Sequence, residues 1–255
     1  MTIIDRYPLA EQIEVAALTP IRNRAWILDR HVQAFQAQTK PPLWHLYTTG
    51  DNEDETLERL RNHCHGFSDP DPLIDVDIFD TGCPAWHRSK EPRYSLNDHA
   101  NLAVVYNHLI DEGLHLFPRS THFWFVDSDV LPEPGCLEAL LEAGEPVCGA
   151  VVEHSPGVYS FIVGEAGDGD PARSPSDAEV ASHNTGVFEV GLVSCCVLYE
   201  RRVLEAKDHN GQHLHRFAPH PRSHDFPMME SIREVDELPV VEVRARATHV
   251  MEEET

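Results

Sequence analysis

Lysine is scarce in this chain of 255 residues, which contains only Lys40, Lys90 and Lys207. Long apolar runs are missing as well, since no stretch approaches the roughly 18 uninterrupted apolar residues of a membrane-spanning helix. The N-terminus carries Asp5 and Arg6 and lacks the basic region followed by an apolar run that marks a signal peptide. These absences argue against a transmembrane segment and predict a protein that stays in the cytoplasm.

The shortage of lysine belongs to a strongly acidic balance, in which 43 acidic residues face 20 basic ones and the formal net charge is -23. One interpretation is functional, because like charge repels polyanions such as nucleic acids. The other is adaptation of the surface to a salty cytoplasm, with arginine over lysine reflecting a GC-rich genome. We favour adaptation, because net charge bears on solubility more than on fold.

None of the six cysteines forms a Cys-x-x-Cys pair, and the adjacent Cys195 and Cys196 lie within an apolar run. In a chain without an export signal we expect reduced, buried thiols. The cluster His63-Cys64-His65 has no partner pair at zinc-finger spacing, so it reads as the exposed end of a helix.

Strand-like and helix-like segments alternate along the chain. We expect Asn23 to cap the first helix and Gly113 to end the third. The Gly- and Asp-rich segment 164–183 reads as a surface loop. The predicted strands are 13–19 (stopped by Pro20), 43–47, 74–79, 121–126, 191–199 and 241–248, and the predicted helices are 23–35, 53–64, 97–113, 134–143, 200–207 and 225–234. This order predicts an α/β fold with a mostly parallel, doubly wound sheet, in one domain spanning 1–255.

Two carboxylates, Asp127 and Asp129, follow the most hydrophobic predicted strand directly. In open α/β sheets, ligands bind just beyond the carboxyl ends of the strands. Carboxylate oxygens suit Mg²⁺ or Mn²⁺, and diphosphate oxygens and water complete the coordination. An isolated Asp-x-Asp is common and can simply solvate a turn, but its position after the strand 121–126 favours a metal site.

The Asp-x-Asp pattern, preceded near the N-terminus by Thr19-Pro20-Ile21-Arg22-Asn23-Arg24, resembles GT-A-fold glycosyltransferases, especially those of family 2. The resemblance spans roughly residues 13–250 through short motifs in the same order. It implies a nucleotide-sugar-binding half at 13–130 and a smaller, mixed α/β acceptor-side half at 131–250. The implied activity is metal-dependent transfer of a sugar from a nucleoside-diphosphate sugar, with UDP favoured, to an acceptor hydroxyl.

The resemblance also assigns roles to individual residues. Asp127, Asp129 and His249 would bind Mn²⁺ or Mg²⁺, with Asp127 contacting either the ribose or a metal-bound water. Asp225 would be the catalytic base of an inverting reaction, beside Arg222 and His224 on the acceptor side. The motif is commonly Glu-Asp, so His224 is a departure and a second candidate base. Donor-binding positions would be Thr19, Pro20, Arg22, Arg24, Asp51, Asn52, Arg93, Asn97 and Ser128.

Simpler interpretations remain open at several of these positions. Asp225 precedes a predicted helix and could also serve as its N-cap. Arg22 and Arg24 could pair with a phosphate or with Asp29. The histidine-rich tract reads as an acceptor-side loop, because its irregular spacing fits no metal chelate; it comprises His209, His213, His215, His220 and His224.

Two rival functions use the same fold. A nucleotidyltransferase or sugar-nucleotide pyrophosphorylase would bind a similar metal-bound diphosphate, but it usually begins with a glycine-rich loop that segment 19–24 lacks. A carbohydrate-binding protein could retain the fold without turnover. The acceptor is a polysaccharide precursor, a small metabolite or modified viral DNA. DNA would require a local basic groove, for which the candidates are Arg201, Arg202, Arg216 and Arg222. The oligomeric state stays undetermined.

Overall fold

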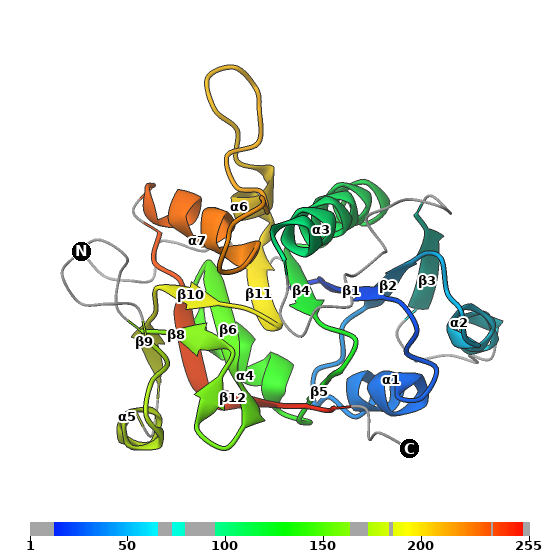
Figure 1. Ribbon diagram of the computed structural model, residues 1–255, viewed down its shortest axis with the longest axis horizontal. Coiled ribbons are helices and arrows are strands. Elements are labelled where there is room, and N and C mark those ends of the chain that lie inside the picture. Colours follow the sequence, from blue (N-terminus) through cyan, green and yellow to red (C-terminus); the bar gives the residue numbers. More distant parts are fainter. Residues whose placement is uncertain are drawn as a thin grey trace.

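The structure, a computed structural model, describes residues 13–65, 73–79, 95–163, 173–183, 186–235 and 237–251. At its centre lies a ten-stranded sheet of order β3-β2-β1-β4-β11-β6-β12-β5, with β7 beside β6 and β9 beside β12 (Figure 1). The strands are β1 (Val15–Ile21), β2 (Trp44–Thr49), β3 (Leu73–Ile78), β4 (His122–Val126), β5 (Val130–Pro132), β6 (Val147–Ser155), β7 (Val158–Tyr159), β8 (Phe161–Ile162), β9 (Val187–Glu189), β10 (Leu192–Val193), β11 (Cys196–Glu200) and β12 (Val240–His249). The helices are α1 (Leu28–Gln36), α2 (Thr56–His65), α3 (Leu96–Leu116), α4 (Cys136–Ala143), α5 (Asp177–Ser182), α6 (Arg201–Glu205) and α7 (Asp225–Arg233).

The direction of the strands divides the sheet into two parts. Strands β3, β2, β1 and β4 run parallel, and they come from the N-terminal half of the chain. Strand β11 then runs antiparallel to both β4 and β6, while β6 and β12 pair in parallel. The predicted α/β class with a mostly parallel sheet is therefore confirmed, and the second half of the chain supplies the mixed portion.

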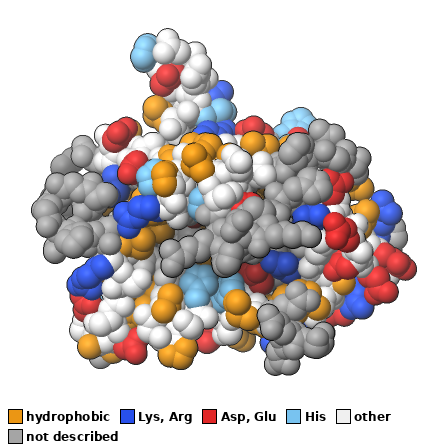
Figure 2. All heavy atoms as spheres, viewed as in Figure 1, with side chains coloured by type: hydrophobic (Ala, Val, Ile, Leu, Met, Phe, Trp, Pro, Cys, Tyr) orange, Lys and Arg blue, Asp and Glu red, His pale blue; other side chains and the backbone are white. Residues whose placement is uncertain are grey.

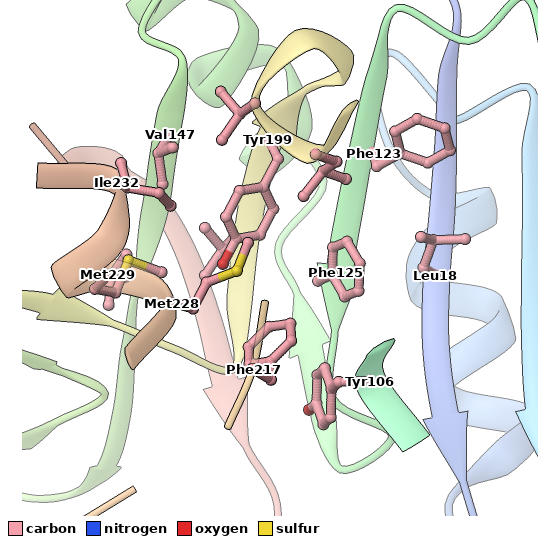
Figure 3. Packing of buried hydrophobic residues seen from close by; sticks show 14 of the residues in the cluster. Leu18, Tyr106, Phe123, Phe125, Val147, Tyr199, Phe217, Met228, Met229 and Ile232 are labelled. Atoms are coloured by element: carbon pink, nitrogen blue, oxygen red, sulfur yellow. The ribbon is translucent and has the colours of Figure 1, made fainter. Parts of the chain in front are cut away.

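Helices cover both faces of this sheet, which explains why its central strands are apolar throughout rather than alternating. In β4, Phe123 and Phe125 pack into the core beneath α3, α6 and α7, whereas Trp124 and Val126 pack into the core formed with α1 and α4 (Figure 1). Figure 3 shows the first of these cores, where Phe125 lies near Tyr106 of α3 and Phe217.

Two of the predicted element boundaries are wrong, each for a local reason. Asn23 does not cap a helix: its φ is 51°, and α1 begins only at Leu28, after Ile27. Gly113 does not end α3, which continues to Leu116. A Cβ on Gly113 would lie 3.0 Å from Leu18 Cδ1 and 3.3 Å from Phe123, so this glycine lets the helix approach the sheet closely.

Smaller differences concern strand β1 and the predicted surface loop. Strand β1 runs through Pro20 to Ile21 instead of stopping before the proline. Within the loop predicted at 164–183, residues 177–182 form α5, which begins with a capping box between Ser176 and Glu179. Residues 164–172 of that loop lie outside the described part of the chain.

The surface carries charges of both signs, and acidic and basic side chains are interspersed at the end of the molecule with α1 and α2 (Figure 2). There Asp29 pairs with Arg59 and His63, at the helix end predicted from the His-Cys-His cluster. Five cysteines are described and all are unbridged, with Cys136, Cys148 and Cys196 buried. Among the described helices, none combines the length and apolar character needed to cross a bilayer.

Candidate active site

A cleft of about 590 Å³ opens at the carboxyl ends of β1 and β4. One side, which we call the strand wall, consists of the turn after β1, the turn after β4 and the end of β12. The other side, the helix wall, consists of the first turns of α3 and the start of α7. The strand wall includes Pro20, Arg22, Asn23, Arg24, Asp127, Ser128, Asp129 and His249, and the helix wall includes Asp98, His99, Asn101, Leu102, Tyr106, Arg222, Ser223, His224 and Asp225.

Asp127 lies at the base of the cleft, where three neighbours hold it. Its carboxylate accepts a short hydrogen bond from the Tyr106 hydroxyl, and its N–H donates to the Cys195 carbonyl at 2.9 Å. The buried His31 ring lies 3.2 Å from the Asp127 carbonyl oxygen. Desolvation, reinforced by the nearby charge of Asp129, raises the pKa of Asp127 to about 7.

Asp129 and His249 face each other although 120 positions separate them in the sequence. Strand β12 pairs with β5 in the register His249 to Val130, and the Val250 N–H donates to the Asp129 carbonyl at 2.8 Å. This pairing places His249 Nε2 3.7 Å from Asp129 Oδ1. The strand pairing therefore brings the end of the chain to the Asp-x-Asp turn.

The gap between Asp129 and His249 fits a shared divalent cation. At 3.7 Å it is too long for a hydrogen bond. Neighbouring ligands about 2.1 Å from one octahedral cation lie roughly 3 Å apart, so the two side chains would share a cation after approaching each other by less than about 1 Å. No group of three or more His, Cys, Asp or Glu residues in the described chain is arranged to hold a metal. Further ligands would then come from phosphate oxygens and water, as is usual for Mg²⁺.

His154 of β6 lies beside this pair, although the sequence did not predict it as a site residue. Its ring centroid is 4.5 Å from that of His249, and its Nε2 is 3.9 Å from Cys195 Sγ. Burial and the neighbouring His249 lower the pKa of His154, so its ring is neutral near pH 7. Cys195 has a left-handed backbone, with a φ of 68°.

Asp51 and Asn52, both predicted to bind the donor, are not among the residues that line the cleft. They bond instead to the turn after β1, which forms part of the strand wall. Asn52 Oδ1 accepts the Asn23 N–H at 3.0 Å, and Asn23 Oδ1 accepts the Glu53 N–H at 2.7 Å. The Arg22 Nε donates to the Asp51 carbonyl at 2.9 Å. These bonds lock the turn after β1 onto the turn after β2.

The remaining predicted donor-binding residues divide into two groups. Pro20, Arg22, Arg24 and Ser128 line the cleft. Thr19 does not: it is fully buried and bonds to His45 Nε2 at 2.9 Å. Asn97 is exposed outside the cleft, and its neighbours Asp98 and His99 line it instead. Arg93 lies outside the described residues.

The two arginines of the strand wall have partners other than Asp29. Arg24 Nη2 donates to Asp129 Oδ2 at 3.1 Å, and Arg22 Nη2 lies 3.4 Å from Glu53. The proposed pairing of either arginine with Asp29 is therefore not observed.

Asp225 is the first helical residue of α7, after His224 in the N-cap position. The alternative in which Asp225 caps the helix is therefore wrong. Its Oδ2 accepts a hydrogen bond from Ser223 Oγ at 2.5 Å, which orients the carboxylate. The opposite oxygen, Oδ1, lies 3.9 Å from His224 Nε2.

His224 is 8% exposed and lines the helix wall. Its ring centroid lies 5.0 Å from that of Tyr106, 5.5 Å from that of Phe217 and 6.1 Å from that of His99. Neither of its ring nitrogens has a hydrogen-bond partner among the described residues. Buried polar nitrogens normally have a partner, so these nitrogens are suited to a ligand in the cleft.

Three of the four arginines suggested for a DNA-binding groove are paired with carboxylates. Arg201 pairs with Glu205 at 2.7 Å, Arg202 with Glu200 at 2.5 Å, and Arg216 with Asp111 at 2.9 Å. Of the four candidates only Arg222 lines the cleft, with its guanidinium carbon 4.4 Å from the Phe226 ring centroid.

The histidine-rich tract disperses in the fold. His215 is buried and bonds to Ser231 at 3.0 Å, and His224 lies in the helix wall. Part of the segment between α6 and α7 forms a loop that projects from the body of the molecule (Figure 1).

Several solved structures share this architecture. GalNAc-T7, crystallised with UDP, GalNAc and Mn²⁺, superposes with a TM-score of 0.63 at 11% identity, over 95% of this chain and 44% of its own. Staphylococcus aureus TarS residues 1–349, crystallised with UDP, gives a TM-score of 0.55 at 14% identity, over 92% and 60% of the two chains. A longer TarS structure gives 0.54 at 12% identity, over 95% and 36%.

The chain thus has the GT-A glycosyltransferase fold. It spans less than two thirds of the length of each of these structures. No protein-family model matches the sequence. No curated protein matches it either.

Proposed function

We propose that this protein is a metal-dependent glycosyltransferase that moves a sugar from a nucleoside-diphosphate sugar, with UDP favoured, to an acceptor hydroxyl. The main support is the 3.7 Å approach of His249 to Asp129 at the end of β4, in a cleft whose opposite wall carries Asp225. The fold shared with GalNAc-T7 and TarS, whose structures contain UDP, supports the choice of donor.

Asp129 and His249 would hold Mn²⁺ or Mg²⁺, with Asp127 beside them. When bound, this cation would neutralise the negative charge that develops on the departing diphosphate. Arg22 and Arg24 lie on the same wall and would reach the phosphates, since guanidinium groups match phosphate oxygens. Ser128 and Pro20 would contact the rest of the nucleotide.

Asp225 would act as the general base. The acceptor hydroxyl oxygen forms a bond to the anomeric carbon, the bond from that carbon to the diphosphate breaks, and the hydroxyl proton passes to the Asp225 carboxylate. The bond from Ser223 leaves Oδ1 available for this proton. A single base opposite the leaving group produces inversion at the anomeric carbon.

His224 and Arg222 would bind the acceptor beside Asp225. The ion pairs of Arg201, Arg202 and Arg216 favour a carbohydrate or a small hydroxyl-bearing metabolite over DNA, because their charges are already neutralised. The turn after β1 contains no glycine, which favours a transferase over a pyrophosphorylase.

Binding measurements followed by a donor screen test this function. Mn²⁺ together with UDP should raise the melting temperature more than either alone, because both would bind the folded state at one site. Nucleotide release from a panel of sugar nucleotides, with candidate acceptors, should then depend on the metal. Binding of Mn²⁺ and UDP without any turnover across the panel would favour a non-catalytic carbohydrate-binding protein. Failure to bind UDP would remove the choice of UDP, and failure to bind any nucleoside diphosphate would refute the proposal.

A further inference from the structure

The ion pair between Arg24 and Asp129 lies directly beside the position that the proposed function assigns to a cation. Arg24 Nη2 lies 3.1 Å from Asp129 Oδ2, and the two side chains are 31% and 21% exposed. The other oxygen of the same carboxylate, Oδ1, faces His249. One carboxylate therefore serves both the guanidinium and the proposed metal site.

Arg24 is anchored at its backbone but only loosely at its side chain. Its N–H donates to Thr56 Oγ1 at 2.7 Å, which fixes the start of the side chain on the strand wall. The guanidinium makes long contacts of 3.5 and 3.3 Å to the carbonyls of Arg22 and Asn23. Its Nε is buried and has no hydrogen-bond partner among the described residues. Among the described residues, Asp129 is thus the only carboxylate paired with the Arg24 guanidinium, and Nε remains available to an oxygen-rich ligand.

A cation bound to Asp129 and His249 would disturb this arrangement. It would lie next to the guanidinium, so two positive charges would compete for one carboxylate and repel each other in a partly buried cleft. A diphosphate arriving with the cation removes this conflict, because the phosphate oxygens accept the guanidinium while Asp129 passes to the metal. Each charge then keeps a partner of opposite sign.

We propose that Arg24 exchanges Asp129 for the diphosphate when the metal and nucleotide bind, so that the two ligands bind cooperatively. This inference rests on the proposed function. Its consequence is that the metal alone binds weakly, because it must displace Arg24 without offering it another anion. By thermodynamic reciprocity, the metal strengthens nucleotide binding by the same factor by which the nucleotide strengthens metal binding.

The test is a set of binding titrations with Mn²⁺ and UDP. Free Mn²⁺ is measured by electron paramagnetic resonance with and without UDP, and UDP binding is measured by calorimetry at saturating Mn²⁺. In Arg24→Gln, Mn²⁺ alone should bind about fivefold more tightly, because Asp129 is released. UDP at saturating Mn²⁺ should bind about tenfold more weakly, because a charge-assisted contact is lost. The two affinities therefore move in opposite directions.

Arg22→Gln is the matched comparison. It removes the same charge from the same wall, but Arg22 contacts Asp51 and Glu53 rather than Asp129. Its effect on Mn²⁺ alone should stay below about twofold, which separates the exchange from a general change in potential. Arg24→Lys keeps the charge and should change the Mn²⁺ and UDP affinities in the same directions as Arg24→Gln, but by smaller factors. This variant replaces Arg24→Gln in the test if the glutamine variant does not fold.

Two results would overturn the exchange. Unchanged or weaker Mn²⁺ binding in both Arg24 variants would show that Arg24 does not compete with the metal for Asp129. Equal tightening in Arg22→Gln would assign the effect to overall charge. Both results require a wild type that binds Mn²⁺ and UDP, so they leave the proposed function standing. A wild type that binds no nucleoside diphosphate would instead remove the proposed function and this inference together.

Discussion

The two walls of the cleft are built in different ways. Polar side chains of the strand wall are cross-linked to one another or to the core, as in the pairs Arg24–Asp129 and Asn23–Asn52. Both walls contain buried nitrogens without a partner among the described residues: Arg24 Nε and His249 Nδ1 in the strand wall, and both ring nitrogens of His224 in the helix wall. The difference is that the whole His224 ring lacks a hydrogen bond, whereas Arg24 still pairs with Asp129. Strand ends held by a sheet impose fixed positions, whereas the start of α7 is positioned by a packed aromatic cluster (Figure 3).

This difference suggests that the strand wall binds the donor and the helix wall binds the acceptor. A wall whose polar side chains are already paired keeps them near their binding positions until a ligand of constant chemistry, such as a cation with a diphosphate, takes over those partners. A wall with unpaired buried nitrogens gains most when the second substrate supplies their hydrogen bonds. Substitutions in the two walls should therefore affect different kinetic parameters.

The strongest test of the strand wall is Asp129→Ala. Losing one of the two proposed metal ligands should reduce metal-dependent transfer by at least about 10³-fold, because the leaving diphosphate would lose its counter-charge. Nucleotide release and Mn²⁺ binding should both fall while the melting temperature changes little. Asp111→Asn, on an exposed pair with Arg216, provides the control and should retain activity. Near-normal turnover in Asp129→Ala would remove the metal-site assignment.

Asp225→Asn tests the helix wall. The amide cannot accept the proton, so kcat should fall by about 10²–10⁴-fold, whereas UDP affinity should stay within about twofold. Calorimetry with Mn²⁺ and UDP checks the binding, and initial rates check the turnover. Loss of UDP affinity with preserved kcat would move Asp225 to a donor-binding role.

The two buried histidines near the strand wall, His31 and His45, should make the free energy of unfolding depend on pH. Burial lowers the pKa of His31 to about 4 and that of His45 well below its ordinary value, so both rings stay neutral in the folded protein. The unfolded chain binds these protons below about pH 6.5, and the folded state therefore loses stability as the pH falls from about 6.5 towards 4. For His31 alone, the loss between pH 7 and pH 5 is about 2 kcal/mol.

Urea denaturation at both pH values measures this effect. His31→Gln should be less stable at pH 7, because it loses the pairing with Tyr47, but its stability should fall less on acidification. His115→Gln, at an exposed position of α3, should keep the wild-type dependence. If His31→Gln and the wild type lost stability equally on acidification, His31 would not be a source of the pH dependence.

The smallest expected effect is that of His224 on acceptor binding. His224→Phe keeps the aromatic packing and removes both nitrogens, so the KM for the acceptor should rise about tenfold with UDP binding unchanged. His224→Gln restores a donor and an acceptor and should recover part of the loss. A large fall in kcat at unchanged KM in His224→Phe would indicate a role in proton transfer instead.

Much of the architecture was predictable because it depends on local pattern. The apolar run ending at Val126 identified a central strand, and the alternation of strands and helices identified the sheet. The two carboxylates after that strand could be placed at the cleft for the same reason. Thr19 and Asn97 were predicted near the right place but point elsewhere, since a shift of one residue reverses a strand's face and turns a helix by about 100°.

Other parts of the site carry no local signal. Tyr106 lies in mid-helix and His154 within a strand, so each reads as an ordinary element residue until the fold brings it beside Asp127 or His249. The inverse holds for Arg201, Arg202 and Arg216, which looked available for DNA. Arg201 pairs with Glu205 four residues along a predicted helix, which the sequence could have indicated, whereas the partners Glu237 of Arg202 and Asp111 of Arg216 lie 35 and 105 positions away and appear only in the folded chain.

The residues by themselves determined the class of fold, the strand that leads into Asp127 and Asp129, and the segments that could contribute to a site, because hydrophobic periodicity and turn chemistry act over a few residues. Tertiary structure alone decided which side chains meet. The pairing of β12 with β5 sets His249 against Asp129, and packing between α3 and α7 places His224 against Tyr106. Those distances depend on strand register and helix packing, which follow from contacts across the whole sheet rather than from any short stretch of sequence.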